Sequence, residues 1–408
     1  MNINTFHWGK ETLAAISIGI ISTLIMSKSA SARRRAKLSS ASNSAARMVQ
    51  SRAPTTEVSI VSSRDVFTED EFEALQSTWG SPPLGQFLKD RHGFTHFVVD
   101  ECCADDGTES KGMVVLAHGL GTSLRAYDDA VVELNKAGYT VLRYDFYNHG
   151  YSKYHVPGKD KWIAYSIDVF IDQVEDLILH VCNDVKRDVI CYIGHSTAGL
   201  VGPAANLRWS LDGSRRSMIP NLVLLAPAMY AKKPFMAKIA DAIPGVLTGL
   251  MRRVHPARNI IYDAYLEAGE IAFGHDDEGN TIHANEEHLK NIQDFKLFGK
   301  TKGVREHPFI ASGLLGINCH TLRGDLLPKH RQMFIEAIKA MEGTSKILHL
   351  WGDRDKTVPF KENVDEVRKW EKDHGLLTLK ILPDLGHELL FEDCKKCALE
   401  AISFLERN

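Results

Sequence analysis

The sequence has no excess of positive charge. Its 408 residues carry a formal net charge of −3 at pH 7. A protein that binds nucleic acid offsets many phosphates with lysine and arginine, so its binding domain is usually strongly basic. We therefore expect no nucleic-acid partner.

Cysteine is sparse, and glycosylation signals are missing. The seven cysteines are scattered, and two of them, Cys182 and Cys191, lie in apolar stretches, unlike the dense pattern of a disulfide-stabilised secreted domain. Cys394 and Cys397 have no second pair nearby, so we interpret them as ordinary thiols and expect no metal site. No Asn-x-Ser/Thr sequon occurs. These absences favour a reducing compartment for the globular part.

Long apolar runs are also missing, apart from one segment at residues 12–26. This segment has no charged residue, and its length of about 15 residues is shorter than the ~20 that span a bilayer comfortably. The basic residues that follow it are Lys28, Arg33, Arg34, Arg35 and Lys37. We favour an uncleaved membrane anchor with the catalytic part on the positively charged, cytosolic side. The alternative is a signal peptide cleaved near residues 30–32, or a signal followed by an organelle transit peptide up to residue 53.

Beyond this region the pattern is that of an α/β protein. Short runs of Val, Ile, Leu and Tyr alternate with longer segments of helical periodicity, which predicts a mostly parallel central sheet with helices on both faces. The expected strands are residues 95–100, 113–117, 140–144, 189–193, 222–225, 347–351 and 377–382. The interval between residues 225 and 347 is too long for one crossover, so it predicts an inserted helical cap.

These patterns divide the chain into four stretches. Residues 1–53 hold the anchor or signal and a linker rich in Ser, Ala and Arg, whose composition cannot bury enough surface to fold alone. Residues 54–228 form the first part of the catalytic core, and residues 229–342 form the helical cap. Residues 343–408 complete the core.

A candidate nucleophile, Ser196, directly follows the strand expected at residues 189–193. A serine on a sharp turn between strand and helix is lifted clear of the sheet, and small neighbours let the two elements approach. Gly194 and Ala198 supply these neighbours. The pattern departs from G-x-S-x-G because Ala198 occupies the position of the second glycine, with Gly199 one place later. The strand, turn and helix together make Ser196 the predicted nucleophile.

An acid and a histidine follow the serine in the order expected of such a fold. Asp353 and Asp355 lie in the loop after the strand at residues 347–351, and His387 ends the loop after the strand at residues 377–382. In a triad of this kind the histidine takes the serine proton, and the carboxylate holds the histidine in the right tautomer. His387 is therefore the predicted base, and a carboxylate of the first loop is its partner.

A glycine-rich loop at residues 118–122 (His-Gly-Leu-Gly-Thr) follows the strand expected at residues 113–117. Attack on a carbonyl carbon creates an oxyanion, which needs preset hydrogen-bond donors. The backbone N–H groups of Leu120 and Thr197 are the candidate donors.

From about Phe94 to the C-terminus, the sequence resembles the α/β-hydrolase superfamily. Residues 118–121 (His-Gly-Leu-Gly) are similar to the family's oxyanion loop. Residues 145–152 are similar to its Asp-x-x-x-x-Gly-x-Ser segment, whose role in the family is structural. The loop Gly-Asp-Arg-Asp at residues 352–355 resembles the family's acid loop, in which the fourth position carries the carboxylate. The resemblance thus implies that Asp355, and not Asp353, is the acid.

The resemblance also narrows the expected reaction. A serine at position 196, where other branches carry aspartate, separates the chain from the haloalkane dehalogenases and epoxide hydrolases. The layout resembles the monoacylglycerol lipase type, which implies hydrolysis of a carboxylic ester with a hydrophobic or lipid acyl group, without metal or cofactor. An amidase or serine aminopeptidase would use the same triad. A non-catalytic ligand receptor or scaffold on this fold is disfavoured by the intact Ser, Asp and His.

Overall fold

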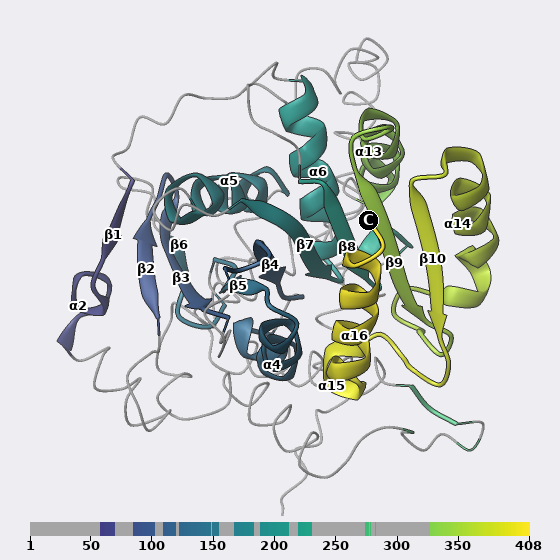
Figure 1. Cartoon of the computed structure of the whole chain (residues 1–408), viewed down its shortest axis with the longest axis horizontal. Helices are drawn as coiled ribbons and strands as arrows, with labels where there is room; N and C mark the ends of the chain where they lie inside the picture. Colours follow the sequence, from purple (N-terminus) through teal and green to yellow (C-terminus); the bar gives the residue numbers. More distant parts are fainter. Residues whose placement is uncertain are drawn as a thin grey trace, which may run out of the picture. The chain divides into compact units, whose positions relative to one another are not determined.

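The computed structural model describes a single unit within Ala53–Asn408 (Figure 1). The described residues are 58–69, 85–102, 109–119, 122–147, 149–154, 167–182, 188–211, 219–230, 274–276, 278, 282 and 327–408. The predicted anchor at residues 12–26 and most of the predicted cap at residues 229–342 lie outside them. Within these ranges, no helix is both long and apolar enough to cross a membrane.

A ten-stranded sheet forms the centre of the described part, in the order β1-β2-β3-β5-β4-β7-β8-β9-β10, with β6 paired to β3. In the sheet order β5-β4-β7-β8-β9-β10, all neighbouring strands are parallel. The strand β3 is antiparallel to β2, β5 and β6, and β1 is antiparallel to β2. The strands are β1 (Ser59–Val61), β2 (Gln86–Lys89), β3 (Gly93–Asp100), β4 (Met113–Ala117), β5 (Thr140–Tyr144), β6 (Lys153–Tyr154), β7 (Val189–His195), β8 (Asn221–Leu225), β9 (Lys346–Gly352) and β10 (Leu377–Leu382).

The predicted fold class is confirmed: this is an α/β protein with a mostly parallel, mixed central sheet. Every predicted strand is present, and β4, β5 and β10 have the predicted bounds. The strands β1, β2 and β6 were not predicted. They are short and lie at or near one edge of the sheet, where a few residues cannot establish an alternating pattern.

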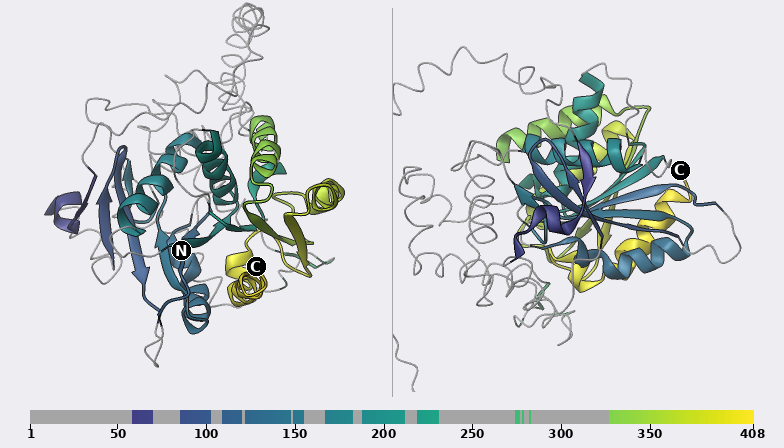
Figure 2. Two further views of the ribbon diagram at one scale, coloured as in Figure 1. Left: turned by 45° about the horizontal axis from the view of Figure 1, so that its top comes forward. Right: turned by 90° about the vertical axis from the view of Figure 1, so that its left-hand side faces the viewer.

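Helices cover both faces of the sheet (Figure 2). On one side α4 and α16 pack together, and on the other α6 packs against α5 and α13. The helices are α2 (Ser63–Val66), α4 (Asp128–Lys136), α5 (Ile167–Leu177), α6 (Ala198–Leu211), α13 (Leu327–Ala340), α14 (Phe360–His374), α15 (Leu389–Glu392) and α16 (Cys394–Leu405). Short single turns at Leu124–Tyr127 and Ala228–Tyr230, and a wider turn at Ile178–Cys182, complete them.

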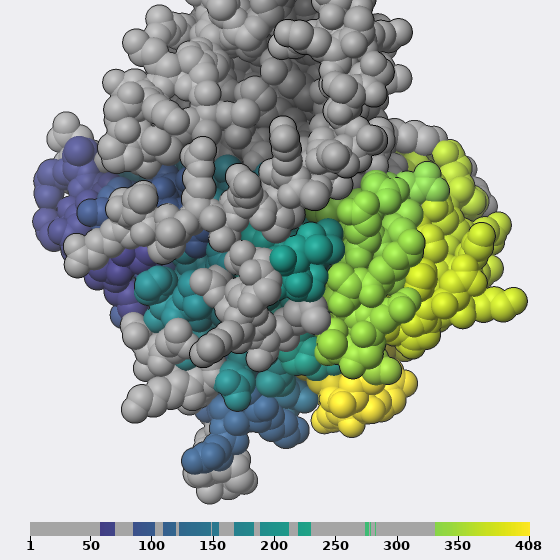
Figure 3. All heavy atoms as spheres, turned by 90° about the horizontal axis from the view of Figure 1, so that it is seen from above, coloured from purple at the N-terminus to yellow at the C-terminus, as the bar shows by residue number. Residues whose placement is uncertain are grey.

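The helix α13 falls in the C-terminal part of the range predicted as a cap. Its apolar residues Phe334, Ala337 and Ile338 are fully buried and belong to the main hydrophobic core. In the view from above, α13 lies beside the exposed end of α6 (Figure 3). This helix therefore contributes directly to the layer that covers the sheet.

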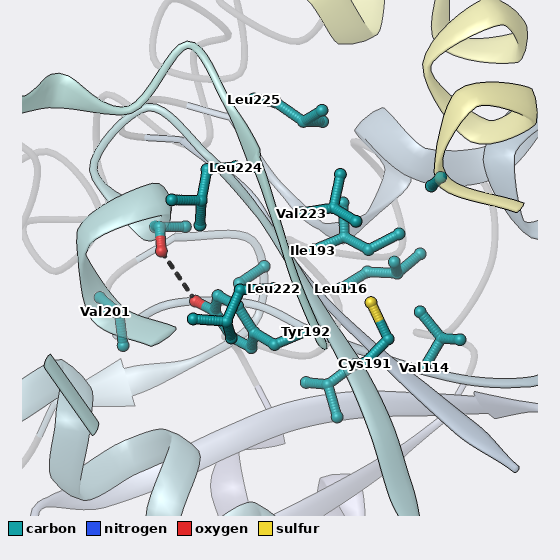
Figure 4. Close-up of a cluster of buried hydrophobic side chains, with 14 of the residues drawn as sticks. Val114, Leu116, Cys191, Tyr192, Ile193, Val201, Leu222, Val223, Leu224 and Leu225 are labelled. Carbon is teal, nitrogen blue, oxygen red and sulfur yellow. Dashed lines mark hydrogen bonds between the residues drawn. The ribbon is translucent and has the colours of Figure 1, made fainter. Parts of the chain in front are cut away.

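Part of the core lies around the central strands β4, β7 and β8, where buried apolar side chains pack together (Figure 4). Every residue of β4 is buried, because a parallel strand covered by helices on both faces needs apolar side chains on both. Cys191 of β7 lies within this cluster as a buried free thiol. Such packing fixes the register of the strands, and so also fixes where each strand ends.

The strand order reverses between β4 and β7, since β5 lies on one side of β4 and β7 on the other. In open α/β sheets, ligand sites form beyond the carboxyl ends of the strands at such a point. The register pairs Ala117 with Gly194, and His195 with Leu225, so β4, β7 and β8 end side by side. The loops that carry the predicted site residues therefore emerge at one edge of the sheet.

Candidate active site

Ser196 occupies the turn between β7 and α6 in a strained backbone conformation. Its φ is 53°, in the left-handed region that residues other than glycine rarely adopt. Its N–H donates to the Leu225 carbonyl at 2.8 Å, and its carbonyl accepts from the N–H groups of Gly199 and Ala228, each at 3.0 Å. These three bonds hold the turn. The side chain of Ser196 is only partly buried.

The turn depends on close approaches at three glycines. A Cβ on Gly194 would lie 2.5 Å from the Ala198 carbonyl oxygen, and one on Gly199 would lie 2.7 Å from Pro227. A Cβ on Gly202 would lie 2.5 Å from the ring of Tyr192. Ala198 is fully buried, and its carbonyl oxygen makes the tight contact with Gly194.

Tyr192 stabilises the turn that carries Ser196, a role that was not predicted from the sequence. Its ring is fully buried, and its hydroxyl donates to the Ala198 carbonyl at 3.0 Å (Figure 4). This bond ties the side chain of β7 to the first residue of α6. The signal in the sequence was a tyrosine two residues before Gly194, in an otherwise aliphatic strand.

The structure brings Ser196, His387 and Asp355 together in one hydrogen-bonded chain. His387 Nε2 lies 2.9 Å from Ser196 Oγ, and His387 Nδ1 lies 2.9 Å from Asp355 Oδ2. His387 and Asp355 are each only 4% exposed. The three residues come from the loops after β7, β9 and β10. With a proton on Nδ1, the imidazole donates to the carboxylate and accepts from the serine hydroxyl.

The two candidate acids have different partners. Asp355 Oδ1 accepts the N–H of Val358 at 2.7 Å, and its Oδ2 accepts from the Trp351 indole at 3.3 Å as well as from His387. Asp353 Oδ1 instead accepts the N–H of Asp384 at 2.8 Å, at the start of the histidine loop. Asp355 is therefore the carboxylate that faces the imidazole.

The electrostatics around His387 favour its protonation. Burial alone would lower the pKa of His387, but the neighbouring Asp355 carboxylate raises it above its ordinary value, with smaller contributions from Glu388 and Glu392. A buried imidazolium beside a carboxylate is the species that forms when a serine gives up its proton. The site is thus suited to stabilise that species.

His195, beside the nucleophile, plays a different part. Burial and the neighbouring His387 lower the pKa of His195 to about 4, so its ring is neutral near pH 7. Its Nε2 lies 2.8 Å from the backbone oxygen of His387 and donates to it. His195 therefore links the serine turn to the histidine loop, and it does not contact the serine hydroxyl in the way a base would.

The glycine-rich loop after β4 lies against the turn that carries Ser196. His118 Nδ1 donates to the Gly119 carbonyl at 2.6 Å, Thr122 Oγ1 donates to the same oxygen at 3.0 Å, and His118 Nε2 accepts the N–H of Phe146 at 2.9 Å. A Cβ on Gly119 would lie 2.8 Å from the His195 ring, so only glycine fits. The predicted donor Leu120 lies outside the described residues.

Thr197, the second predicted donor, is buried beside Ser196 and directly precedes α6. A backbone N–H at the start of a helix is a favourable donor to negative charge. Its role and that of Leu120 in an oxyanion hole stay predictions.

Asp145 organises the segment after β5. Its carboxylate accepts from His96 Nδ1 at 2.7 Å and from the N–H groups of Leu124 and Tyr151 at 2.8 and 3.0 Å. Gly150, with a φ of 48°, passes so close that a Cβ would overlap this carboxylate. Burial alone would raise the pKa of Asp145, yet His96 brings it below its usual range. The segment thus supports the site structurally.

No cluster of three or more metal-ligating side chains occurs in the part of the chain that the structure describes. Cys394 and Cys397 are buried free thiols whose S–H groups point to the backbone oxygens of Ala126 and Leu389. Burial raises the pKa of Cys394 to about 12, so this thiol is unreactive near neutrality.

The sheet order, the strained serine turn and the Ser-His-Asp chain define an α/β-hydrolase of the serine hydrolase class. Comparison with known proteins agrees with a serine hydrolase of this fold: the chain is similar to esterases and lipases. Residues 108–305 match the family described as serine aminopeptidase S33. That match includes Ser196 and ends before Asp355 and His387.

Individual relatives are distant. The chain is 24% identical over 302 residues to a monoacylglycerol lipase of Mycolicibacterium smegmatis. The alignment covers 72% of this chain and 88% of the lipase. Its structure is similar to an esterase from Exiguobacterium antarcticum, with a TM-score of 0.53, 16% identity, and coverage of 79% of this chain and 100% of the esterase. An enol-lactonase from Burkholderia xenovorans gives a TM-score of 0.51 and 18% identity, covering 78% and 99%. These structural likenesses show the fold.

Proposed function

We propose that this protein hydrolyses a carboxylic ester with a hydrophobic or lipid acyl group, through Ser196, His387 and Asp355. The observation that carries the proposal is the continuous chain of two 2.9 Å contacts from Ser196 Oγ through the imidazole to Asp355. The serine sits on a strained turn at the carboxyl edge of the sheet, and Ser196 is the least buried of the three residues.

The chemistry follows from this order of groups. Ser196 Oγ attacks the carbonyl carbon while His387 Nε2 takes the hydroxyl proton, and Asp355 stabilises the imidazolium that results. His387 then gives the proton to the departing alcohol, which leaves an acyl group on Ser196. Water then attacks the acyl carbon while His387 takes one of its protons. The bond from that carbon to Ser196 Oγ breaks, His387 returns the proton to this oxygen, and the carboxylic acid leaves. The N–H of Thr197 is the donor proposed for the oxyanion, together with that of Leu120.

The relatives favour an ester, and not an amide, as the substrate. The Mycolicibacterium smegmatis relative is a monoacylglycerol lipase, and it aligns over most of both chains. Cleavage of an amide by an aminopeptidase is the second candidate, because the matching family is described as serine aminopeptidase. The triad serves both reactions, since the two differ in the leaving group that His387 must protonate.

A comparison of substrates tests the proposal. The full chain is assayed with p-nitrophenyl esters of increasing acyl length, with monoacylglycerols and with aminoacyl amides, and its serine is labelled with a fluorophosphonate. We expect labelling, and a higher kcat/KM for long-chain esters than for the amides. A preference for aminoacyl amides would establish the aminopeptidase function, and an unlabelled protein without hydrolysis would support a non-catalytic binding protein.

We also propose that residues 12–26 attach the enzyme to a membrane, with the catalytic part on the cytosolic side. The support is the uncharged segment followed by lysine and arginine. A lipid-facing location would bring the site close to hydrophobic substrates. The alternative, cleavage as a signal or transit peptide, leads to a different mature N-terminus.

A further inference from the structure

A buried carboxylate outside the triad joins two distant segments beside the site. Glu392, at the end of α15, is 7% exposed. Its Oε2 accepts the N–H of Gly386 at 2.9 Å and the N–H of Gly274 at 2.9 Å, and its Oε1 lies 3.1 Å from the same N–H of Gly386. Gly386 directly precedes His387, whereas Gly274 comes from the long interval between β8 and β9.

Gly274 lies directly against the backbone of the histidine loop. A Cβ on Gly274 would be 2.6 Å from the carbonyl oxygen of Asp384 and 3.0 Å from the nitrogen of Gly386. Only a residue without a side chain allows this approach. The N–H of Ile282 also donates to the Gly274 carbonyl at 3.0 Å, so the Gly274 backbone is held on both of its polar groups.

The rest of the histidine loop is held by other partners. The N–H of Arg354 donates to the Leu385 carbonyl at 2.9 Å, and His195 Nε2 donates to the His387 carbonyl at 2.8 Å. Glu392 accepts the N–H of Gly386, which lies between the Leu385 and His387 carbonyls along the chain. Because Gly386 is adjacent to His387, a shift of its peptide would move the imidazole away from both of its 2.9 Å partners.

The charge of Glu392 also reaches the imidazole. Burial raises the pKa of Glu392 to about 7, with Glu388 and Asp355 adding to this rise and the N–H groups of Gly386 and Gly274 opposing it. In turn, the Glu392 carboxylate is one of the groups that raise the pKa of His387. In the described part of the chain, the charged or titratable groups that interact with it are Glu388, Asp355, His387 and the buried thiol Cys397.

We propose that Glu392 is a positioning residue: by binding Gly386 and Gly274 together it holds His387 in register with Ser196, and it makes the reactivity of Ser196 depend on the contact with the segment at Gly274. This inference rests on the proposed triad. It assigns a role in the reaction to part of the interval between β8 and β9, through a contact with the backbone of the histidine loop.

The test is the rate at which a fluorophosphonate labels Ser196 in the full chain, measured from pH 5 to 9. Glu392→Gln keeps the shape of the side chain but loses its charge, and we expect labelling about tenfold slower at pH 7.5. Glu392→Ala removes both bonds, and a loss of about a hundredfold is expected, as for a misplacement of catalytic groups by about 1 Å. Gly274→Ala forces the segment off the loop and is expected to slow labelling several-fold.

Glu371 offers a matched control, because its carboxylate also accepts a backbone N–H, that of Leu379 in β10, at 3.0 Å. Glu371→Gln should leave the labelling rate and its pH dependence unchanged. In Glu392→Gln the acid limb of the pH profile should move to lower pH above about pH 7, where Glu392 is ionised in the wild type and raises the pKa of His387. Below that pH the two profiles should converge. A merely structural carboxylate would not produce this shift.

The outcomes separate the two proposals. A wild-type protein that the probe does not label contradicts the proposed serine hydrolase function itself. If the wild type is labelled but Glu392→Gln keeps its rate and pH profile, the positioning role is wrong. An equal slowing in Glu371→Gln overturns it as well. If Glu392→Ala does not fold, Glu392→Gln and Gly274→Ala still test the positioning role of Glu392. Normal labelling in both of these variants would contradict it.

Discussion

Ser196 combines a reactive hydroxyl with an unfavourable backbone conformation, so replacing it should abolish activity without destabilising the fold. Replacement by alanine removes the nucleophile and opens no core cavity, since the side chain is only partly buried. Turnover should vanish in Ser196→Ala while the free energy of unfolding changes by less than about 1 kcal/mol. Retained ester hydrolysis in this variant would contradict the assignment of the nucleophile.

Glycine at the same position should stabilise the inactive protein. The φ of 53° is costly for alanine and serine but not for glycine. We expect Ser196→Gly to unfold with a free energy about 1 kcal/mol above that of Ser196→Ala, as measured by urea denaturation. Equal stability of the two variants would show that the turn is not strained in solution.

The two aspartates of the acid loop should differ sharply on substitution. Asp355→Asn removes the charge that stabilises the imidazolium and places an N–H₂ group opposite the donors of His387 or Val358, so kcat should fall about a thousandfold or more. Among the described residues, the hydrogen bond of the Asp353 carboxylate is the one that it accepts from the N–H of Asp384, and an asparagine oxygen can still make this bond. Asp353→Asn should therefore reduce kcat only mildly. The reverse ranking would transfer the acid role to Asp353.

His349 should make the fold sensitive to acid. It is fully buried in β9 and stacks on Trp351, and neither ring nitrogen has a hydrogen-bond partner among the described residues. Burial lowers the pKa of His349 to about 3. Below pH 6.5 the unfolded chain takes up a proton here that the folded protein does not, so the stability due to the neutral ring decreases as pH falls from 6.5 towards 3.

A leucine at this position would remove that dependence. Relative to the wild type, His349→Leu should gain about 2 kcal/mol of unfolding free energy at pH 5 beyond any difference present at pH 7. Urea denaturation of both proteins at the two pH values measures this change. A difference between variant and wild type that is the same at both values would contradict the buried, neutral histidine.

At the scale of secondary-structure elements, the turn that carries Ser196 should be most sensitive to substitutions where α6 packs against β7. Gly202→Ala would bring a Cβ within 2.5 Å of the Tyr192 ring and push the start of α6 away from the strand. Overpacking of this kind costs about 1–3 kcal/mol, and the displaced serine should also lower kcat. Ser210→Ala, on the exposed side of the same helix, is the control and should be close to neutral.

A double substitution separates this clash from other effects of alanine. If the ring of Tyr192 is the obstacle, Tyr192→Leu combined with Gly202→Ala should be less destabilised than the sum of the two single variants. Strict additivity would mean that the alanine acts through something other than this contact.

The longer strands were predictable from the sequence, whereas the short strands at one edge of the sheet were not. The strands β4, β5 and β10 had their predicted bounds. β4 and β5 are largely apolar runs in the covered part of the sheet, and β10 alternates apolar and polar residues, as a half-exposed strand does. The strands β1 and β2 form by antiparallel pairing, β2 with β3 and β1 with β2, and short segments do not reveal such pairing in their own sequence. Local pattern therefore predicted the sheet from β3 to β10 and missed the short strands β1, β2 and β6 beside β3.

The same division applies to the site. Ser196, Asp355 and His387 each follow a strand, so chain order and topology were enough to group them. Glu392 and His195 act on the backbone of the histidine loop, and such contacts depend on how loops fold over one another. The partner of Glu392 at Gly274 is 118 residues away in sequence, and no spacing rule connects the two.

At the scale of the whole chain, the remaining prediction concerns location. The apolar residues 12–26 and the basic residues after them precede every group of the proposed triad. If the segment is an anchor, the full-length protein should stay in the membrane pellet after a carbonate wash, with its globular part open to protease from the cytosolic side. Removal of residues 1–53 should then release an active enzyme into the supernatant, because the linker adds little to the core.

The mature N-terminus distinguishes the anchor from a targeting signal. A signal or transit peptide would be cleaved near Ala32 or further along, and the shortened enzyme would be recovered inside an organelle. N-terminal sequencing of the native protein decides between the two. A chain in the pellet that still contains Met1 supports the anchor, and a shortened chain in the soluble organelle fraction excludes it. Either result leaves Ser196, Asp355 and His387 on the retained part, so the activity measured in each fraction reports where hydrolysis takes place.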